Sequence, residues 1–287
     1  MSKPYILQLR PEGLYCEEGD FYIDPVRKVP RAVITHGHSD HARPGHGAVL
    51  ATRETLDVML ARYGQKFAGT TQALKYGEVI RLGKAEVSLK PAGHVLGSAQ
   101  VVVETAGQRI VVSGDYKRGP DPTCTPFEPV PCDVFVTEAT FGLPVFTHPP
   151  VETQVAELLA SMATFKERAH FIAAYSLGKA QRLVALLRRA GYSQPIYVDR
   201  ATARLCDIYE HHGVSLGDIQ PLEHQDARSL AGSIVVAPPS SRAFVQSETL
   251  HPPVTSFASG WMRVKKRARA GGGDLPLIIS DHADWPE

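Results

Sequence analysis

The chain has 287 residues, of which 43% are hydrophobic, so it can bury a sizeable core as one large domain or two smaller ones. Its 31 Lys and Arg residues balance 30 Asp and Glu residues, which leaves any attraction to a polyanion to local clusters. The four cysteines lie far apart without a Cys-x-x-Cys pair and are expected to be reduced thiols. Residues 1–5 do not begin a signal peptide, and no run of about eighteen apolar residues occurs. We therefore expect a cytoplasmic protein without a membrane partner.

The first half of the chain alternates short apolar segments with turns, and its clearest helix is expected at residues 54–63. Strands are predicted at 21–23, 32–34, 48–50, 79–82, 100–104, 109–112 and 134–137. This alternation of apolar segments and turns continues to about residue 147 and indicates a strand-rich half with a sandwich fold.

A dense group of metal-ligand residue types follows the predicted strand at 32–34. Within Thr-His-Gly-His-Ser-Asp-His-Ala stand His36, His38, Asp40 and His41. Side chains two apart at a strand end point the same way, so His36 and His38 can bind one ion, and a turn then directs Asp40 and His41 toward a second. Imidazole and carboxylate suit Zn²⁺ and related divalent ions. The alternative, a histidine-rich surface loop, does not require an acid between the second and third histidines.

Two further candidate ligands lie downstream at similar positions. His94 stands in the glycine-flanked turn Pro-Ala-Gly-His-Val-Leu-Gly (91–97), and Asp115 ends the predicted strand Arg-Ile-Val-Val-Ser-Gly-Asp (109–115). Taken alone, His94 reads as a turn histidine and Asp115 as a turn or helix-cap acid. Because ligand types recur at predicted strand ends, we interpret both as part of the metal site, and a carboxylate at 115 could bridge two ions.

The second half of the chain alternates helices and strands, which predicts a parallel α/β layer. Helices are expected at 151–168, 179–190 and 201–211, and strands at 171–175, 195–198 and 233–237. Pro-Pro at 149–150 and Gly-Gly-Gly at 271–273 mark crossings between two domains. The segment 275–280 is predicted to be a strand that rejoins the first domain.

His-x-His-x-Asp-His, then His94, then Asp115 resembles the ligand series of metallo-β-lactamase-fold hydrolases. Three other segments resemble motifs of the nucleic-acid-cleaving branch that carries an inserted β-CASP domain: Phe-Val-Thr-Glu-Ala-Thr-Phe-Gly (135–142), Ala-Tyr-Ser-Leu-Gly-Lys-Ala-Gln-Arg (174–182) and Ile-Ser-Asp-His-Ala-Asp-Trp (279–285). The segments 13–25 and 257–262 are similar to a bacterial exonuclease group found beside ATP-dependent DNA ligases and helicases.

This resemblance implies an αββα sandwich of metallo-β-lactamase type with an inserted α/β domain. The catalytic domain would comprise residues 1–147 and 274–287, and the β-CASP-like insertion residues 148–273. The implied cofactors are two divalent ions, Zn²⁺ or alternatively Mn²⁺, about 3.5–4 Å apart, which activate a shared hydroxide. The implied ligands are His36, His38 and His94 for the first ion, Asp40 and His41 for the second, and Asp115 for both.

Other roles also come from the resemblance. Asp24 would orient a ligand histidine, although an Asp-Pro turn is the alternative. Glu138 and His282 would serve the leaving group, while a strand-end surface acid and a capping residue are the alternatives for these two positions. Asp40 would be catalytic as well as a metal ligand. In related enzymes a further histidine beyond the position of His282 often completes the second metal site. The printed sequence ends at Glu287, so the occupancy of that site is left open.

Two segments are candidates for contact with nucleic acid. Ser176 and Lys179 fall at a predicted helix start, where backbone N–H groups suit a phosphate, unless Ser176 is only an N-cap. The second candidate is a basic cluster that consists of Arg263, Lys265, Lys266, Arg267 and Arg269. An ordinary solvated surface is an equally good interpretation of this cluster. We expect substrate to lie in a cleft between the two domains.

Together these features predict a metal-dependent DNA exonuclease acting in repair, with DNA as substrate and a ligase/helicase system as partner. An RNA-processing nuclease of the same branch is the first alternative, because nothing in the sequence tests for a 2′-hydroxyl. A small-molecule hydrolase of lactones or thioesters is the second, and the inserted α/β layer argues against it. A non-catalytic nucleic-acid-binding scaffold is the third, and the intact ligand series argues against that.

Overall fold

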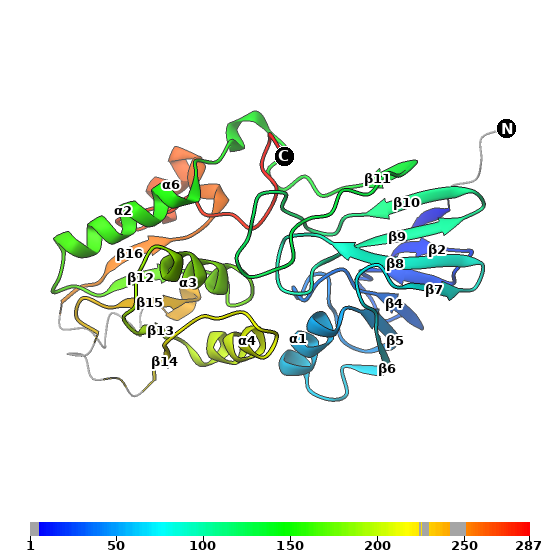
Figure 1. The fold of residues 1–287 in the computed structure, drawn as a ribbon, viewed down its shortest axis with the longest axis horizontal. Coiled ribbons are helices and arrows are strands. Elements are labelled where there is room, and N and C mark those ends of the chain that lie inside the picture. The colour runs from blue at the N-terminus through cyan, green and yellow to red at the C-terminus, as the bar shows by residue number, and fades with distance from the viewer. Residues whose placement is uncertain (1–5, 224, 226–229, 242–250) are drawn as a thin grey trace. The chain divides into compact units, whose positions relative to one another are not determined.

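The computed structural model describes residues 6–223, 225, 230–241 and 251–287 (Figure 1). Contacts divide the chain into two compact units, Met1–Ala139 and Thr140–Glu287. Residues 1–5, considered above for a signal peptide, lie outside the described residues. Within the described part, no helix has the length and apolar character needed to cross a membrane.

The first sheet of unit 1 positions the cassette at residues 36–41. Its order is β1-β2-β3-β4-β5-β6, in which β1 to β3 are antiparallel and β3 to β6 are parallel. The strands are β1 (Leu7–Arg10), β2 (Gly13–Cys16), β3 (Phe21–Ile23), β4 (Arg31–Val33), β5 (His46–Ala51) and β6 (Ala68–Ala73). Because β3 and β4 are parallel neighbours, their carboxyl ends meet at one edge, and so do the segments that follow them.

The second sheet packs against the first. Its order is β11-β10-β9-β8-β7, and only β10 and β11 are parallel. The strands are β7 (Val79–Leu82), β8 (Ala85–Pro91), β9 (Ala99–Thr105), β10 (Gln108–Val112) and β11 (Val134–Val136). Between the sheets lies a buried apolar core to which Ile23, Val33, Leu89 and Val101 belong. All three residues of the edge strand β11 are exposed.

Helix α1 (Arg53–Tyr63) covers the other face of the first sheet. Leu56 and Met59 pack there against Ile34 and Val49. The helix begins after Thr52, whose side chain accepts a hydrogen bond from the N–H of Thr55. Unit 1 is thus a mixed α/β structure in which two sheets and one helix layer stack. Among its described residues α1 is the single helix, so the outer helix layer of the predicted αββα sandwich stays a prediction.

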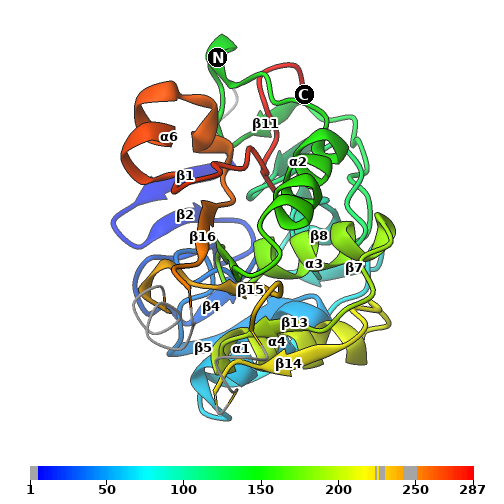
Figure 2. The same ribbon diagram turned by 90° about the vertical axis from the view of Figure 1, so that its left-hand side faces the viewer.

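Unit 2 is built on a five-stranded parallel sheet in the order β14-β13-β15-β12-β16 (Figures 1 and 2). Four of its strands are almost entirely buried, as expected for apolar runs in a parallel sheet covered on both faces, whereas the edge strand β14 is partly exposed. The strands are β12 (His170–Ala173), β13 (Ile196–Val198), β14 (Ile219–Pro221), β15 (Ile234–Ala237) and β16 (Val254–Phe257); the helices are α2 (Val151–Thr164), α3 (Lys179–Arg189), α4 (Arg200–His211) and α6 (Lys265–Gly271). Short 3₁₀ turns occur at Pro144–Phe146, Pro239–Ser241 and Gly260–Arg263.

Two predicted elements are wrong in extent or kind. The first helix of unit 2 ends at Thr164, four residues early, because the charged segment after Phe165 continues no apolar stripe. The predicted strand at 275–280 is a single bridge between Ala258 and Leu277. Pro276 has no N–H to donate, and the N–H of Ile278 goes to the side chain of Gln154 (2.7 Å) instead of a ladder. Contacts group residues 274–287 with unit 2, and the predicted domain boundaries stay a prediction.

Candidate metal centre

The segment after β4 turns sharply and brings four potential ligands together. The N–H of Ile34 still donates to the carbonyl of Leu50 and extends the β4–β5 pairing by one residue. Beyond it, the N–H groups of His41 and Ala42 both donate to the carbonyl of His38, at 3.1 and 2.7 Å. This turn reverses the chain and returns His41 toward the end of the strand.

Three imidazole nitrogens converge at one point of unit 1. His36 Nε2 lies 3.0 Å from His38 Nδ1, which lies 3.1 Å from His94 Nε2. If His36 Nε2 and His94 Nε2 are both acceptors, His38 Nδ1 can donate its one proton to only one of them. A cation coordinated by all three nitrogens accounts for both close contacts. Ligand atoms of His36, His38, His94 and Asp115 all lie within 4.8 Å of one another, a donor set that suits a divalent metal.

His94 reaches this point from the turn between β8 and β9, which Ser98 holds closed. The hydroxyl of Ser98 accepts the N–H groups of His94 (3.0 Å) and Val95 (3.2 Å). The N–H of Ala99 donates to the carbonyl of Thr35 at 2.8 Å, which ties this turn to the cassette. His94 is 1% exposed and His36 is fully buried, so the group is largely shielded from water.

The carboxylate of Asp115 lies among the imidazoles. Its Oδ2 is 3.6 Å from His36 Nε2, 3.7 Å from His94 Nε2 and 3.5 Å from His41 Nε2. His41 Nε2 in turn lies 3.8 Å from Oδ2 of Asp40, whose side chain is 75% exposed. One oxygen of Asp115 is therefore similarly distant from residues of both predicted ion sites. The Asp40–His41 side is the more exposed one.

Asp24 and Thr35 orient two of these histidines. Thr35 donates from its N–H to Asp24 Oδ1 (2.8 Å) and from its hydroxyl to Asp24 Oδ2 (2.6 Å). The hydroxyl oxygen, 3.0 Å from His36 Nδ1, is then left as an acceptor, so Nδ1 carries the proton and Nε2 keeps its lone pair for a cation. Asp24 Oδ2 also lies 2.7 Å from His41 Nδ1 and fixes that ring in the same way.

The backbone and charges around Asp24 fit this role. Asp24 has a φ of +44°, a left-handed conformation that aspartate tolerates better than most residues. Burial disfavours protonation of His41, but the hydrogen bond to Asp24 and the charges of Asp24, Asp115 and Asp40 outweigh it and raise its pKa to about 9. Three carboxylates thus favour a positive charge at this position.

Three residues of this arrangement were not predicted from the sequence. Thr35 and Ser98 supply the hydroxyl contacts described above. Gly114 has a φ of +56°, and a Cβ there would lie 2.7 Å from the Cβ and Oγ1 of Thr35. Thr35 directly precedes the cassette and Gly114 directly precedes Asp115, and this proximity in sequence was the one sign that could have pointed to them. Their close approach to each other arises only from the tertiary fold.

Glu138, predicted to serve the leaving group, follows β11 in unit 1. Its Oε1 accepts the N–H of Tyr116 at 2.9 Å, one residue after Asp115. Its own N–H donates to the hydroxyl of Ser113 at 3.4 Å. Glu138 thus holds the segment that carries Asp115, in addition to any role in catalysis.

His282 lies in a half-buried loop of unit 2. Its N–H donates to Ser280 Oγ (3.1 Å), and its ring meets that of Phe141 edge-on with centroids 6.0 Å apart. Asp284 Oδ2 accepts the N–H of His148 at 2.8 Å. The motif at residues 279–285 is therefore fixed to unit 2 on both sides of His282.

The start of α3, predicted to hold a phosphate, is occupied by contacts within the protein. Lys179 is 4% exposed, and its Nζ lies 3.0 Å from Asp281 Oδ1. The N–H groups of Gly178 and Ala180 already donate to Gln181 Oε1 (2.8 Å) and the carbonyl of Tyr175 (3.1 Å). Ser176 contributes its carbonyl to Gln181 Nε2 at 2.9 Å. The ammonium predicted to meet a phosphate thus has a protein carboxylate as partner.

The basic cluster lies on and just before α6, and all five of its side chains are exposed. Arg263 donates from Nε to the carbonyl of Thr147 at 3.0 Å. The guanidinium of Arg267 lies 4.1 Å from the ring centroid of Trp261. The charges of Lys265, Lys266 and Arg269 are the most available for a phosphate backbone.

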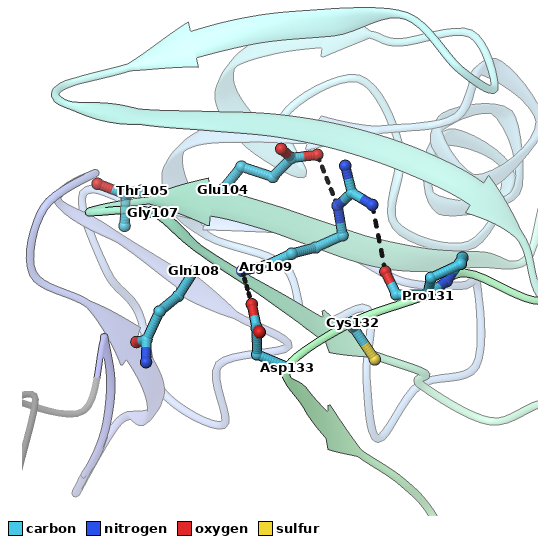
Figure 3. Close-up of a pocket in the computed structure, with 8 residues that line it drawn as sticks. All are labelled: Glu104, Thr105, Gly107, Gln108, Arg109, Pro131, Cys132 and Asp133. Carbon is cyan, nitrogen blue, oxygen red and sulfur yellow. Dashed lines mark hydrogen bonds and ion pairs between the residues drawn. The ribbon is translucent and has the colours of Figure 1, made fainter.

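A separate hollow of about 670 Å³ lies at the turn between β9 and β10 (Figure 3). Arg109 crosses it, donating from Nε to Glu104 Oε1 (2.9 Å) and from a terminal nitrogen to the carbonyl of Pro131 (3.3 Å). None of the eight residues drawn in Figure 3 is a predicted site residue. The hollow is thus distinct from the group of candidate metal ligands.

Known proteins similar to this chain fall among nucleic-acid enzymes. A probable DNA ligase of Opitutus terrae is 29% identical over 96% of this chain and 27% of its own length. Ribonuclease TTHA0252 of Thermus thermophilus is 30% identical over 66% of the chain and 50% of its own length. Endoribonuclease ysh1 of Aspergillus fumigatus is 35% identical over 41% of the chain and 15% of its own length. The chain therefore spans at most half the length of these relatives.

These relatives point to a metallo-β-lactamase/β-CASP family. It is the family that the motifs of this chain resemble. A comparison with models of protein families found no match. A crystal structure of a protein of unknown function from Enterococcus faecalis V583 matches 88% of this chain and 70% of its own, with a TM-score of 0.56 and 14% identity. That likeness shows a shared fold alone.

Proposed function

We propose that this chain is a metal-dependent nuclease that degrades DNA from an end and acts in repair. The observation that carries the proposal is the position of Asp115 Oδ2, 3.5–3.7 Å from nitrogens of His36, His41 and His94. The similarity of nearly the whole chain to a probable DNA ligase supports DNA as the substrate. It also supports a ligase system as the partner of this protein.

The residues of unit 1 would hold two divalent ions. His36, His38 and His94 would ligate the first, Asp40 and His41 the second, and Asp115 both. When bound, such ions supply the activation of water and the neutralisation of charge on a phosphoryl group. Asp24 and Thr35 occupy the Nδ1 side of His41 and His36, so the Nε2 lone pairs of both rings would be available to the ions. Glu138 holds the segment of Asp115 through the N–H of Tyr116.

The test uses purified protein with end-labelled linear DNA and with circular single-stranded DNA, each with and without Zn²⁺ or Mn²⁺. We expect metal-dependent loss of label from the linear DNA and no cutting of the circle. Asp115→Ala should lose most bound metal and activity, because its carboxylate serves both sites. Glu86→Ala, which removes an exposed carboxylate of β8, is the matched control. Wild-type metal content in Asp115→Ala would contradict the assignment.

His282 is the residue proposed to protonate the leaving group. A scissile phosphodiester expels an alkoxide, and loss of a positioned acid typically costs roughly 10²–10⁴-fold in rate. We expect His282→Ala to keep its metal but lose DNA cleavage to this extent. A nitrophenyl phosphodiester, whose leaving group needs no proton, should be affected much less. Equal losses on both substrates would assign His282 to metal binding or structure.

RNA processing is the second candidate function, because two of the similar proteins are ribonucleases. End-labelled RNA of the same sequence as the DNA, assayed under the same conditions, distinguishes the two. Faster cleavage of RNA at equal concentration would favour this candidate.

A further inference from the structure

Unit 2 contains a buried ion pair that joins the first residue of α3 to the residue before His282. Lys179 Nζ lies 3.0 Å from Asp281 Oδ1, and the two side chains are 5% and 3% exposed. The ammonium also lies 5.1 Å from the ring centroid of Tyr175. Lysine and aspartate are rarely buried this completely unless they are paired.

The pair is one of several contacts that fix the backbone on both sides of His282. Before it, the N–H of Leu277 donates to the carbonyl of Phe257 (3.1 Å) and that of Ile278 to Gln154 Oε1 (2.7 Å). After it, the N–H of His148 donates to Asp284 Oδ2 (2.8 Å). Asp281 adds an ion pair that ties this segment to helix α3.

Energetics favour a positioning role for this pair over a stabilising one. Desolvating two charges costs about as much as their attraction returns, and apolar residues of similar shape are often as stabilising. An ion pair instead fixes the orientation of both side chains, because the carboxylate must face the ammonium. The direction of Asp281 fixes the backbone at the adjacent His282.

We propose that Lys179 is a positioning residue that orients His282 through Asp281. The proposal rests on the proposed function, in which His282 donates a proton. It replaces the predicted contact of Lys179 with a phosphate, since the lysine is buried and its ammonium faces a carboxylate. Lys179 then acts on turnover and not on DNA affinity.

The experiment compares Lys179→Met/Asp281→Leu, which replaces the pair by apolar side chains, with Lys179→Arg, which keeps the charge. For the double variant we expect a thermal transition close to that of the wild type and a kcat on DNA lower by up to about 10²-fold, the cost of a small misplacement. KM and its salt dependence should stay within twofold of the wild type. Lys179→Arg should restore most of kcat. In a His282→Ala background the double substitution should cause no further loss.

A second readout needs no nuclease activity. The ring resonances of His282 are identified by their absence from the NMR spectrum of His282→Ala, and they should shift or broaden in the double variant. Unchanged resonances would overturn the proposal, even if the wild type cleaves no DNA and the proposed function fails. An unchanged kcat in a nuclease-active protein would overturn it as well. A raised KM with a flatter salt dependence would instead make Lys179 a DNA contact.

Discussion

Thr35 is the residue through which Asp24 reaches His36. Its hydroxyl donates to the carboxylate and accepts from the ring, so Thr35→Val leaves His36 Nδ1–H without this acceptor. We expect the affinity for the first ion to fall by about 10–100-fold, as is usual when the partner of a ligand histidine is lost. Thr35→Ser keeps the hydroxyl and should stay within a few-fold of the wild type. A competition titration with a chromogenic chelator measures the metal affinity of both variants. Equal affinities of Thr35→Val and the wild type would contradict the role of the Thr35 hydroxyl in orienting His36.

His170 makes the stability of unit 2 depend on pH. Burial lowers the pKa of His170 below 6.5, and this effect is larger than the opposite effect of a backbone hydrogen bond with Arg168. The ring Nε2 lies 2.9 Å from Ser161 Oγ. Below pH 6.5 the unfolded chain binds a proton that the folded chain resists, so stability present above pH 6.5 is lost as pH falls through the folded pKa. His170→Gln removes this group, and its free energy of unfolding should fall less than that of the wild type between pH 7.5 and 5.5. Urea titrations at the two pH values measure the difference, and identical pH dependences would contradict it.

At the scale of elements, the turn after β10 must pass very close to the cassette. Gly114 has a φ of +56° and no room for a Cβ beside Thr35. Gly107, in the turn between β9 and β10, has a φ of +69° with open space around it, which makes it a matched control. Both alanine variants should lose about 1–2 kcal/mol from the left-handed backbone. Gly114→Ala should in addition weaken metal binding, measured by titration, because it displaces Thr35; equal metal affinities in the two variants would contradict this.

The sequence predicted the elements whose local pattern agrees with their environment. Helices α1, α3 and α4 were predicted to within about two residues because their apolar stripes are continuous, and so were ten strands: β3, β4, β5, β7, β9, β10, β11, β12, β13 and β15. The buried strand β16 was not predicted. Strand β6, Ala-Gly-Thr-Thr-Gln-Ala, was missed because it is mostly exposed and its stability comes from pairing with β5. The segment at 275–280 was overpredicted because its pairing with the chain at 255–259 is limited to one bridge, at Leu277.

In the candidate site, too, residue types could be predicted from local sequence, whereas their contacts could not. The residues with metal-binding chemistry could be proposed from type and spacing, and His36, His38, His94 and Asp115 do lie together. What local sequence could not show is which side chain faces which. The hydroxyl of Thr35 between Asp24 and His36, and the burial of Lys179 against Asp281, both depend on segments brought together only by folding.

At the scale of the whole molecule, a nearly neutral chain can attract a polyanion only through local clusters of charge. The charges of Lys265, Lys266 and Arg269 are exposed, and unlike Arg263 and Arg267 these residues make no described contact with Thr147 or Trp261. Replacing these three by Gln should raise the KM for DNA and reduce the slope of log affinity against log salt by roughly two to three, while kcat at saturation stays close to wild type.

The matched control for this variant replaces Lys66, Lys75 and Lys84, three exposed lysines of unit 1, and removes the same net charge. It should leave the salt slope close to that of the wild type. If both triple variants lose affinity equally, net charge and not the basic cluster governs DNA binding.

One carboxylate, Asp24, serves histidines of both predicted ion sites, His36 through Thr35 and His41 directly. In the proposed two-metal site, whichever ion bound first would order a group that the other ion also needs, and the second would bind to a site already organised in part. Linkage requires this coupling to be reciprocal, so each ion changes the affinity of the other by the same factor. Asp24 would thereby give two metals bound at the proposed sites a cooperative element that opposes their mutual repulsion.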